Sequence, residues 1–234
     1  MRNRSLDLRL RVGADEFELH FEVPLESVTA KELLPLLRPF SDALVQIGAQ
    51  RADGPISCGP GCGACCRQIV PVSEAEIWAV AEYVDSLGEA ERQVFSERFD
   101  QALETLAEHA VELPADGNLL SLDSEARADL AIRYFHAGVP CPFLVDESCG
   151  IHPIRPIRCR EYLVTSPAGN CAHPDTAEIR GVEMKAKLST PLYGTSVERR
   201  AIPLVLALWW SRNHRESLPR TPGPELLKKL LSNL

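Results

Sequence analysis

The stretch Cys58-Gly-Pro-Gly-Cys62-Gly-Ala-Cys65-Cys66 contains four of the chain's eight cysteines. The other four form a second group much later in the chain, at Cys141, Cys149, Cys159 and Cys171. The spacing of Cys62 and Cys65 lets two sulfurs reach one ion while the backbone turns around it. The intervening glycines permit positive φ and a close approach of amide groups to sulfur. The two groups therefore predict the two halves of one soft-metal site.

The eight thiols leave the number of metal centres open. Cys65 and Cys66 are adjacent, so their sulfurs cannot both reach one small ion with relaxed geometry. Eight soft ligands would complete two four-coordinate sites, or they would supply one cluster together with a resolving or catalytic thiol.

Four disulfides are the alternative use of these cysteines. Residues 1–10 alternate charge with leucine and lack the apolar core of a signal peptide. We therefore expect a cytoplasmic protein, in which reduced thiols are more suited to metal binding or redox chemistry than to disulfides.

The composition is that of an ordinary globular protein of 234 residues with a formal net charge of −8. That charge argues against nucleic-acid binding, which requires a basic surface. The longest apolar run, residues 201–210, contains Pro203 and is too short to span a membrane. We predict neither a nucleic-acid nor a membrane partner, and expect an unknown protein redox partner or a substrate.

Hydrophobic periodicity predicts a mainly helical α+β fold around a loop-built cysteine site. Alternation over residues 5–23 predicts an antiparallel β-hairpin. Residues 29–50 have a helical pattern, in which Pro35 and Pro39 predict two short pieces. Ser73-Glu-Ala-Glu76 is a capping box that begins a further helix. The expected buried stripe of that helix is Ile77, Val80, Ala81 and Val84.

The rest of the chain predicts more helices than strands. Helical spacing from Phe95 predicts a long helix that stops near Leu113, and another helix is expected over residues 124–136. The proline-rich second cysteine region should form loops with one short helix around residues 154–162. Residues 182–188 alternate and predict a third strand beside the amino-terminal hairpin. The last predicted helices lie at residues 196–215, bent or begun near Pro203, and at residues 224–234.

These segments predict one domain with three regions. Residues 1–53 form an amino-terminal hairpin and helix extension, and residues 54–175 form the cysteine-cluster region. Residues 176–234 supply a carboxy-terminal strand and helices that pack on the same domain.

Taken together, the cysteine motifs resemble the CxxCxxCC cysteine-cluster family, the YkgJ-type proteins with a zinc- or iron-chelating domain. The matching stretches are Cys62-Gly-Ala-Cys65-Cys66-Arg67, Cys141-Pro-Phe-Leu144, and Cys149-x-Ile-x-x-x-Arg155-Pro156-x-x-Cys159-Arg160. Two positions depart from the family pattern. Three residues rather than two separate Cys58 from Cys62, and His152 stands where tyrosine is common.

The resemblance implies that the metal ligands come from the whole set Cys58, Cys62, Cys65, Cys66, Cys141, Cys149, Cys159 and Cys171. It also implies an iron-sulfur cluster, of the 4Fe-4S type, or iron, with zinc as the alternative. Four thiolates around a divalent ion carry a net charge of −2, which nearby guanidinium groups would offset. The arginines in these stretches are Arg67, Arg155, Arg158 and Arg160.

Three functions remain open on these grounds. The first is an iron-sulfur protein with a redox or enzyme-supporting role, favoured by all-thiolate ligation without a firm histidine ligand. The second is a structural or chelating zinc protein. The third is a metal-dependent enzyme related to flagellin lysine N-methylases, which resemble this chain in the cysteine domain. No catalytic residue can be assigned, because the chain has neither a Rossmann glycine fingerprint nor a recognisable Ser-His-Asp order.

Overall fold

The computed structural model describes residues 3–12, 15–232 and 234 of the chain. The helices are α1 (Ala30–Gln50), α2 (Glu74–Ser86), α3 (Glu89–Glu108), α4 (Ser124–His136), α5 (Ile157–Arg160), α6 (Ser189–Leu192), α7 (Ala207–Asn213) and α8 (Gly223–Leu231). The strands are β1 (Asn3–Val12), β2 (Asp15–Pro24), β3 (Ser27–Val28), β4 (Pro71–Val72), β5 (Leu144–Val145), β6 (Ser148–Cys149), β7 (Ile202–Pro203) and β8 (Thr221–Pro222). Short 3-10 turns are η1 (Ala64–Arg67), η2 (Leu119–Ser121), η3 (His152–Ile154), η4 (Ala168–Ala172) and η5 (Leu204–Leu206). The strands form two-stranded antiparallel sheets, and the helices contain more residues than the strands. The fold is therefore α+β and mainly helical, as the sequence predicted.

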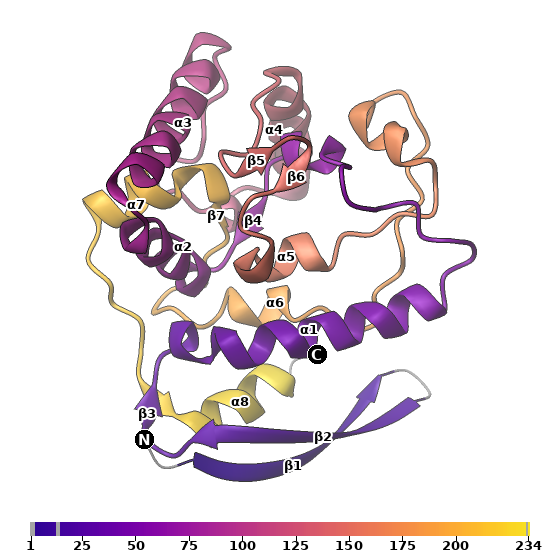
Figure 1. The fold of residues 1–234 in the computed structure, drawn as a ribbon, viewed down its shortest axis with the longest axis vertical. Helices are drawn as coiled ribbons and strands as arrows, with labels where there is room; N and C mark the ends of the chain where they lie inside the picture. Colours follow the sequence, from indigo (N-terminus) through magenta and orange to yellow (C-terminus); the bar gives the residue numbers. More distant parts are fainter. Residues whose placement is uncertain (1–2, 13–14, 233) are drawn as a thin grey trace.

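The amino-terminal hairpin forms as its alternating pattern predicts. Strands β1 and β2 pair antiparallel, with Leu6 opposite Phe21 and Leu8 opposite Leu19. The buried Phe21 ring meets Phe40 of α1 edge to face, with ring centroids 5.5 Å apart. Figure 1 shows the hairpin beneath α1 and α8, where its apolar face closes a hydrophobic cluster that these helices share.

Helix α1 runs unbroken through Pro35 and Pro39, so the prediction of two short pieces was wrong. Each proline lacks an N–H, which leaves the carbonyl four residues earlier without its helical partner. Both prolines are exposed and lie one turn apart, so water can bond those carbonyls. The opposite face buries enough apolar surface to keep the helix whole. Its buried apolar residues include Leu33, Leu34, Leu37, Phe40 and Leu44.

Helix α2 begins at the predicted capping box. The Ser73 hydroxyl oxygen accepts a hydrogen bond from the Glu76 amide (3.3 Å), and the Glu76 carboxylate accepts one from the Ser73 amide (3.0 Å). All four residues of the predicted stripe are buried. Helix α4 has the predicted bounds, whereas α3 ends earlier than expected, because the backbone turns at Ala110 with a positive φ of 53°.

Phe143 anchors the second cysteine region to the helical part of the molecule. Its ring packs against Phe95 and Phe99 of α3, with centroid distances of 5.1 and 5.3 Å. The side chains of Cys141 and Cys149 are partly buried against the same hydrophobic cluster. Apolar packing therefore fixes this cysteine region on α3, while the short helix α5 appears where one was predicted.

Residues 182–188 do not form the third strand that their alternation predicted. The burial pattern itself is alternating, with Met184, Ala186 and Leu188 buried. Met184 lies against α1, because a Cβ atom on Gly48 would come within 2.6 Å of its Sδ. The alternation therefore reflects an extended segment that buries every second side chain against a helix rather than pairing with the hairpin.

Residues 196–215 are not one helix either. Strand β7 first pairs with β4, placing Ile202 opposite Val72 and Pro203 opposite Pro71. The helix α7 begins only at Ala207, after η5. The proline near the helix start was therefore identified correctly, but the residues before it are not helical. Ladders of two residues, such as this one, are too short to produce a periodic signal.

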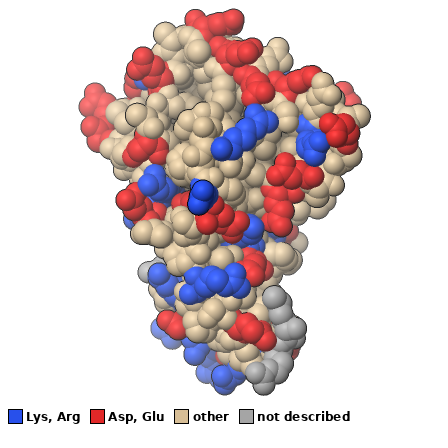
Figure 2. Space-filling model, turned by 90° about the vertical axis from the view of Figure 1, so that its left-hand side faces the viewer, with Lys and Arg blue, Asp and Glu red and all other residues tan. Residues whose placement is uncertain are grey.

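Within the described ranges, no helix is long and apolar enough to cross a membrane. Figure 2 shows the charges on one side of the molecule. Asp and Glu side chains predominate over the upper, helical part of this face, and Lys and Arg side chains gather toward its lower end. The exposed arginines of the hairpin include Arg4, Arg9 and Arg11.

Replacing Glu76 by alanine should destabilise the fold much more than the same change in the capping box of α1. Glu76 is 2% exposed, and its carboxylate accepts from the Ser73 amide, the Ser73 hydroxyl and the Ile157 amide. Removing it leaves buried donors unpaired, for which we expect a loss of about 3 kcal/mol in the free energy of unfolding. Glu32→Ala, in the more exposed box with Thr29, should cost about 1 kcal/mol. Urea denaturation of both variants measures the difference, and equal losses would contradict the assigned role.

Candidate metal centre

The first cysteine loop consists of tight turns. The Cys62 amide donates to the Gly59 carbonyl (3.2 Å), and the Cys66 amide donates to the Gly63 carbonyl (2.9 Å). Between them Gly61 has a φ of +81°, which favours glycine. These turns keep the four cysteines of the loop in one curled segment that ends in η1.

Gly63 lies directly against the turn between β5 and β6. A Cβ atom at this position would come within 2.5 Å of Glu147 Oε2 and 2.8 Å of Leu144 Cδ1. The Arg67 guanidinium closes the same contact by donating to both carboxylate oxygens of Glu147, at 2.6 and 3.0 Å. The loop of the first cysteines is therefore packed on the hairpin that carries Cys149.

Further hydrogen bonds join the two cysteine regions. The Cys141 amide donates to the Cys66 carbonyl (2.7 Å), and the Val164 amide donates to Cys58 Sγ (3.4 Å). The Ser57 amide donates to the Val164 carbonyl (3.1 Å). In addition, η1 packs against η4, the turn that carries Cys171. The two regions are thus in direct contact at several points.

Helix α5 presents Cys159 and is held from both sides. The Ile157 amide at its start donates to the buried Glu76 carboxylate (2.7 Å). Arg160 is 4% exposed, and its guanidinium donates to both carboxylate oxygens of Asp42 in α1, at 2.8 and 2.7 Å. Its remaining N–H groups donate to three carbonyls of the chain between β6 and α5. The position of Cys159 therefore depends on helices α1 and α2.

The thiols of both regions gather around Cys65. A hydrogen bond with Cys66 and then burial raise the pKa of the Cys65 thiol. Burial is the main cause of a raised thiol pKa at five other cysteines, and the nearby charge of Cys65 contributes at each of them. These five are Cys58, Cys141, Cys149, Cys159 and Cys171. Sulfur atoms from distant parts of the sequence therefore lie within electrostatic reach of one thiol.

Around Cys65 the other thiols fall into two groups. One group joins Cys58, Cys62 and Cys171, and the other joins Cys141, Cys149 and Cys159. The adjacent Cys65 and Cys66 belong to the same turn and could supply one further thiol to each group of three. This arrangement is compatible with both of the cysteine assignments that the sequence left open.

Nearby backbone amides partly offset the effect of burial on the pKa of two of these thiols. The amide of Phe143 lowers the pKa of Cys141, and the amide of Ile151 lowers the pKa of Cys149, in each case from two residues later. Such amide groups favour the thiolate form. Burial nevertheless raises the pKa of Cys141 to about 12. The thiol is therefore protonated at neutral pH, and a metal ion would have to displace its proton.

All eight cysteines lie in the described part of the chain and carry free thiols. Among residues 3–12, 15–232 and 234, no group of three or more His, Cys, Asp or Glu side chains is spaced as the ligands of a metal ion. Bringing four thiols onto one ion would therefore require rotation of cysteine side chains or movement of their loop. Gly61, whose φ of +81° lies in the left-handed region, provides backbone freedom for this movement.

The chemistry of the surrounding groups fits a thiolate-bound metal. The histidines are exposed: His20, His109, His136, His152, His173 and His214. The donors that gather at the site are therefore soft sulfur atoms. Among the nearby arginines, Arg67 and Arg160 pair with carboxylates, whereas Arg155 has a buried Nε without a hydrogen-bond partner. An unpaired guanidinium beside the thiols suits a centre of negative charge.

Tyr162 is a further residue of the site that the sequence did not single out. Its hydroxyl group lowers the pKa of Cys171, and the same phenol is affected by Gln68. No spacing rule relates these residues, because they lie on separate loops. Only the folded structure brings the phenol to the thiol.

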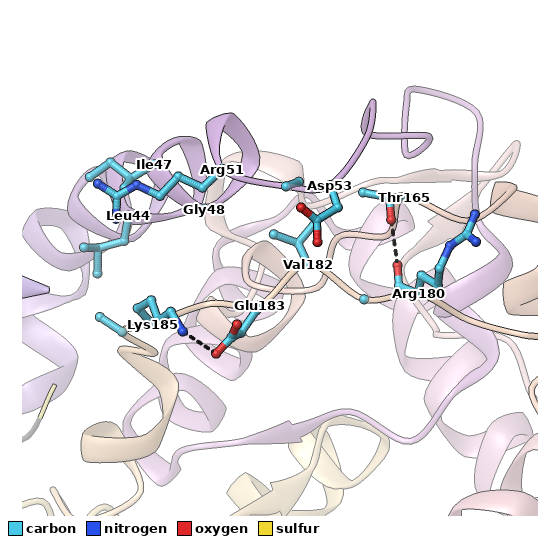
Figure 3. A pocket seen from close by; sticks show the side chains of 13 residues that line it. Leu44, Ile47, Gly48, Arg51, Asp53, Thr165, Arg180, Val182, Glu183 and Lys185 are labelled. Atoms are coloured by element: carbon cyan, nitrogen blue, oxygen red, sulfur yellow. Dashed lines mark hydrogen bonds and ion pairs between the residues drawn. The ribbon is translucent and has the colours of Figure 1, made fainter. Parts of the chain in front are cut away.

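Figure 3 shows a cavity beside the end of α1. It has a volume of about 230 Å³ and is formed by the end of α1, Thr165 and residues 180–186. None of its lining residues is a cysteine. Lys185 and Glu183, which face it, pair with each other at 2.6 Å. The candidate metal centre is therefore defined by the cysteine loops and not by this cavity.

Substituting alanine for Gly63 should separate the two cysteine regions. The added Cβ would collide with Glu147 and Leu144, so we expect a loss of about 1–2 kcal/mol in the free energy of unfolding. We also expect weaker metal retention. Gly59→Ala is the matched control, because no heavy atom lies within 4 Å of a Cβ there. Denaturation gives the free energy of unfolding of the two variants, and metal analysis gives their metal content. Equal values for both variants would show that the contact at Gly63 is unimportant.

Comparison with known proteins places this arrangement in a family. The sequence matches the CxxCxxCC family, described as "Putative zinc- or iron-chelating domain", over residues 57–178, which is more than half of the chain. No match was found among curated proteins or among solved structures. The matched segment contains all eight cysteines and supports metal binding in general. The chain belongs to the CxxCxxCC family.

Proposed function

We propose that this chain is an iron-sulfur protein whose cysteines hold the cluster and whose role is redox or enzyme-supporting. The observation that carries the proposal is the convergence of thiols from two distant regions on Cys65. The proposed ligands are drawn from Cys58, Cys62, Cys65, Cys66, Cys141, Cys149, Cys159 and Cys171. A cluster bound there would supply one-electron transfer.

The residues around the thiols support this chemistry. The Val164 amide donates to Cys58 Sγ, and nearby amides lower the pKa of Cys141 and Cys149. Hydrogen bonds to sulfur help to set the potential of a cluster. Partial burial shields the sulfurs from solvent. We infer that the protein works in the cytoplasm, where free thiols persist, and that a protein redox partner or a substrate approaches the site.

The two thiol groups make the number of centres measurable. If Cys65 and Cys66 serve different groups, the chain can hold two four-thiolate centres. If one of them is a spare thiol, a single centre results. The metal content per chain distinguishes these cases, because the two arrangements differ twofold in the number of clusters.

Zinc is the second candidate. The Cys62–Cys65 pair has the spacing of a zinc knuckle, and the family description names zinc beside iron. Structural zinc favours closed four-thiolate sites, which either thiol group could complete. The zinc alternative uses the same ligands, so the distinction lies in the metal and not in the residues.

Protein purified without oxygen should contain iron and acid-labile sulfide and should absorb broadly near about 400 nm, as sulfur-ligated clusters do. Removing the iron with a chelator should abolish this absorption. Replacing both Cys65 and Cys159 by serine should also prevent loading, because it removes a thiol from each cysteine region. Stoichiometric zinc with no iron in anaerobic protein would favour the second candidate, and neither metal would refute both.

Metal affinity should rise with pH. Burial raises the pKa of Cys58, Cys141, Cys149, Cys159 and Cys171, so these thiols are protonated near neutrality and must lose protons to bind metal. Adding Zn²⁺ to reduced protein should therefore release about one proton for each cysteine that becomes a ligand. Titration in weak buffer measures the protons, and affinity that is unchanged between about pH 6 and 8 would exclude buried thiols as ligands.

A further inference from the structure

Arg155 differs from Arg67 and Arg160 because its side chain has no carboxylate partner, and it differs from Arg158 because its Nε is buried without a hydrogen bond. Arg67 pairs with Glu147, and Arg160 pairs with Asp42. For the Arg155 guanidinium, the structure records no hydrogen bond or ion pair with any described residue, and its Nε is buried. A buried donor without a partner lowers the stability of a fold, so it requires an explanation.

The backbone holds Arg155 firmly beside the thiols. It lies between Cys149 and Cys159 in the sequence and directly follows η3. Its amide donates to the His152 carbonyl (3.4 Å), and its carbonyl accepts from Arg160 Nε (3.1 Å). The following residue, Pro156, is buried. The unpaired side chain is therefore attached to a backbone segment that is fixed by several contacts.

The charge of Arg155 reaches thiols of both cysteine regions. Its guanidinium opposes the effect of burial and of neighbouring thiols on the pKa of Cys58, Cys65, Cys149 and Cys159. Two of these cysteines come from the first region and two from the second. Together with its buried Nε and its place in the chain between Cys149 and Cys159, this identifies Arg155 as a charge of the cysteine region.

We propose that Arg155 is the counter-ion of the metal–thiolate centre. The inference rests on the proposed function, because its partner is the negative charge that appears when thiolates bind the metal. Four thiolates with a divalent ion carry a net charge of −2, and a guanidinium in a partly desolvated place offsets such charge strongly. Arg155 then acts as a positioning residue for charge and is not itself a metal ligand.

Two substitutions at position 155 and one matched control test the proposal. Arg155→Met removes the charge and the unpaired Nε but keeps an unbranched side chain, and Arg155→Lys keeps the charge. Arg158→Met is the control, since Arg158 is also half-buried and its charge acts on Glu161 and Tyr193. Zn²⁺ affinity is measured by competition with a chromophoric chelator. We expect Arg155→Met to weaken binding about tenfold, Arg155→Lys to retain most of it, and the control to match the wild type.

The thermal stability of the metal-free chains separates this role from a structural one. Because Arg155 has no partner among the described residues, Arg155→Met should leave the metal-free midpoint unchanged or raise it, while the metal-loaded midpoint falls. In iron-loaded protein the same variant should have a lower reduction potential, because the more negative reduced cluster loses a compensating charge.

The outcomes distinguish this inference from the proposed function. A wild-type chain that binds neither Zn²⁺ nor iron refutes the metal site as a whole. A wild-type chain that binds metal, with Arg155→Met binding equally well, overturns the role of Arg155 alone. A fall in metal-free stability that parallels the loss of affinity, with no rescue by lysine, would show instead that Arg155 supports the fold.

Discussion

The buried carboxylate of Glu76 is the contact on which the arrangement of the cysteines depends. It closes the start of α2, shortly after the first cysteine loop, and it also accepts from the Ile157 amide at the start of α5. Cys159 lies two residues after Ile157. One side chain therefore ties the downstream anchor of one cysteine region to the helix that presents a thiol of the other. Arg160 adds a second tie, from α5 to Asp42 of α1.

The thiols themselves show two opposing influences. Burial among apolar side chains favours neutral sulfur, whereas amide donors and Arg155 favour the thiolate. Burial prevails at Cys58, Cys141, Cys149, Cys159 and Cys171, where it raises the thiol pKa. A bound cation would reverse this balance, because it would replace several protons and give the unpaired guanidinium a negative neighbour. The two cysteine regions already touch through hydrogen bonds such as the one from the Cys141 amide to the Cys66 carbonyl.

Sequence patterns correctly predicted the elements that depend on residues close together in the chain. The hairpin, the capping box at Ser73 and the bounds of α4 could all be predicted from periodicity and spacing. The prediction of a break at Pro35 and Pro39 was wrong because helix propensity alone does not reveal that both prolines face water. The opposite face of the helix is held by buried leucines. The prediction of a strand at residues 182–188 was wrong because an alternating pattern indicates which side chains are buried but not which element covers them.

The relations within the site were beyond the reach of sequence patterns. Four arginines near the cysteines looked equivalent until Glu147 and Asp42, from other elements, were found to pair with two of them. Tyr162 meets Cys171 only through the folding of two loops. Whether an arginine has a carboxylate partner depends on contacts between residues that are distant in the sequence. The spacing of residues in a single sequence does not reveal such contacts.

The turn between β5 and β6 has a consequence for how relatives can diverge. Asp146 and Glu147 both adopt positive φ, of 47° and 55°, where glycine would be less strained. Glycine at position 147 would relax the backbone but would abolish the partner of Arg67 and uncover Gly63. The backbone at position 147 would thus favour glycine, whereas the ion pair with Arg67 requires a carboxylate there. Among related sequences, we therefore expect the residues at positions 63, 67 and 147 to change together.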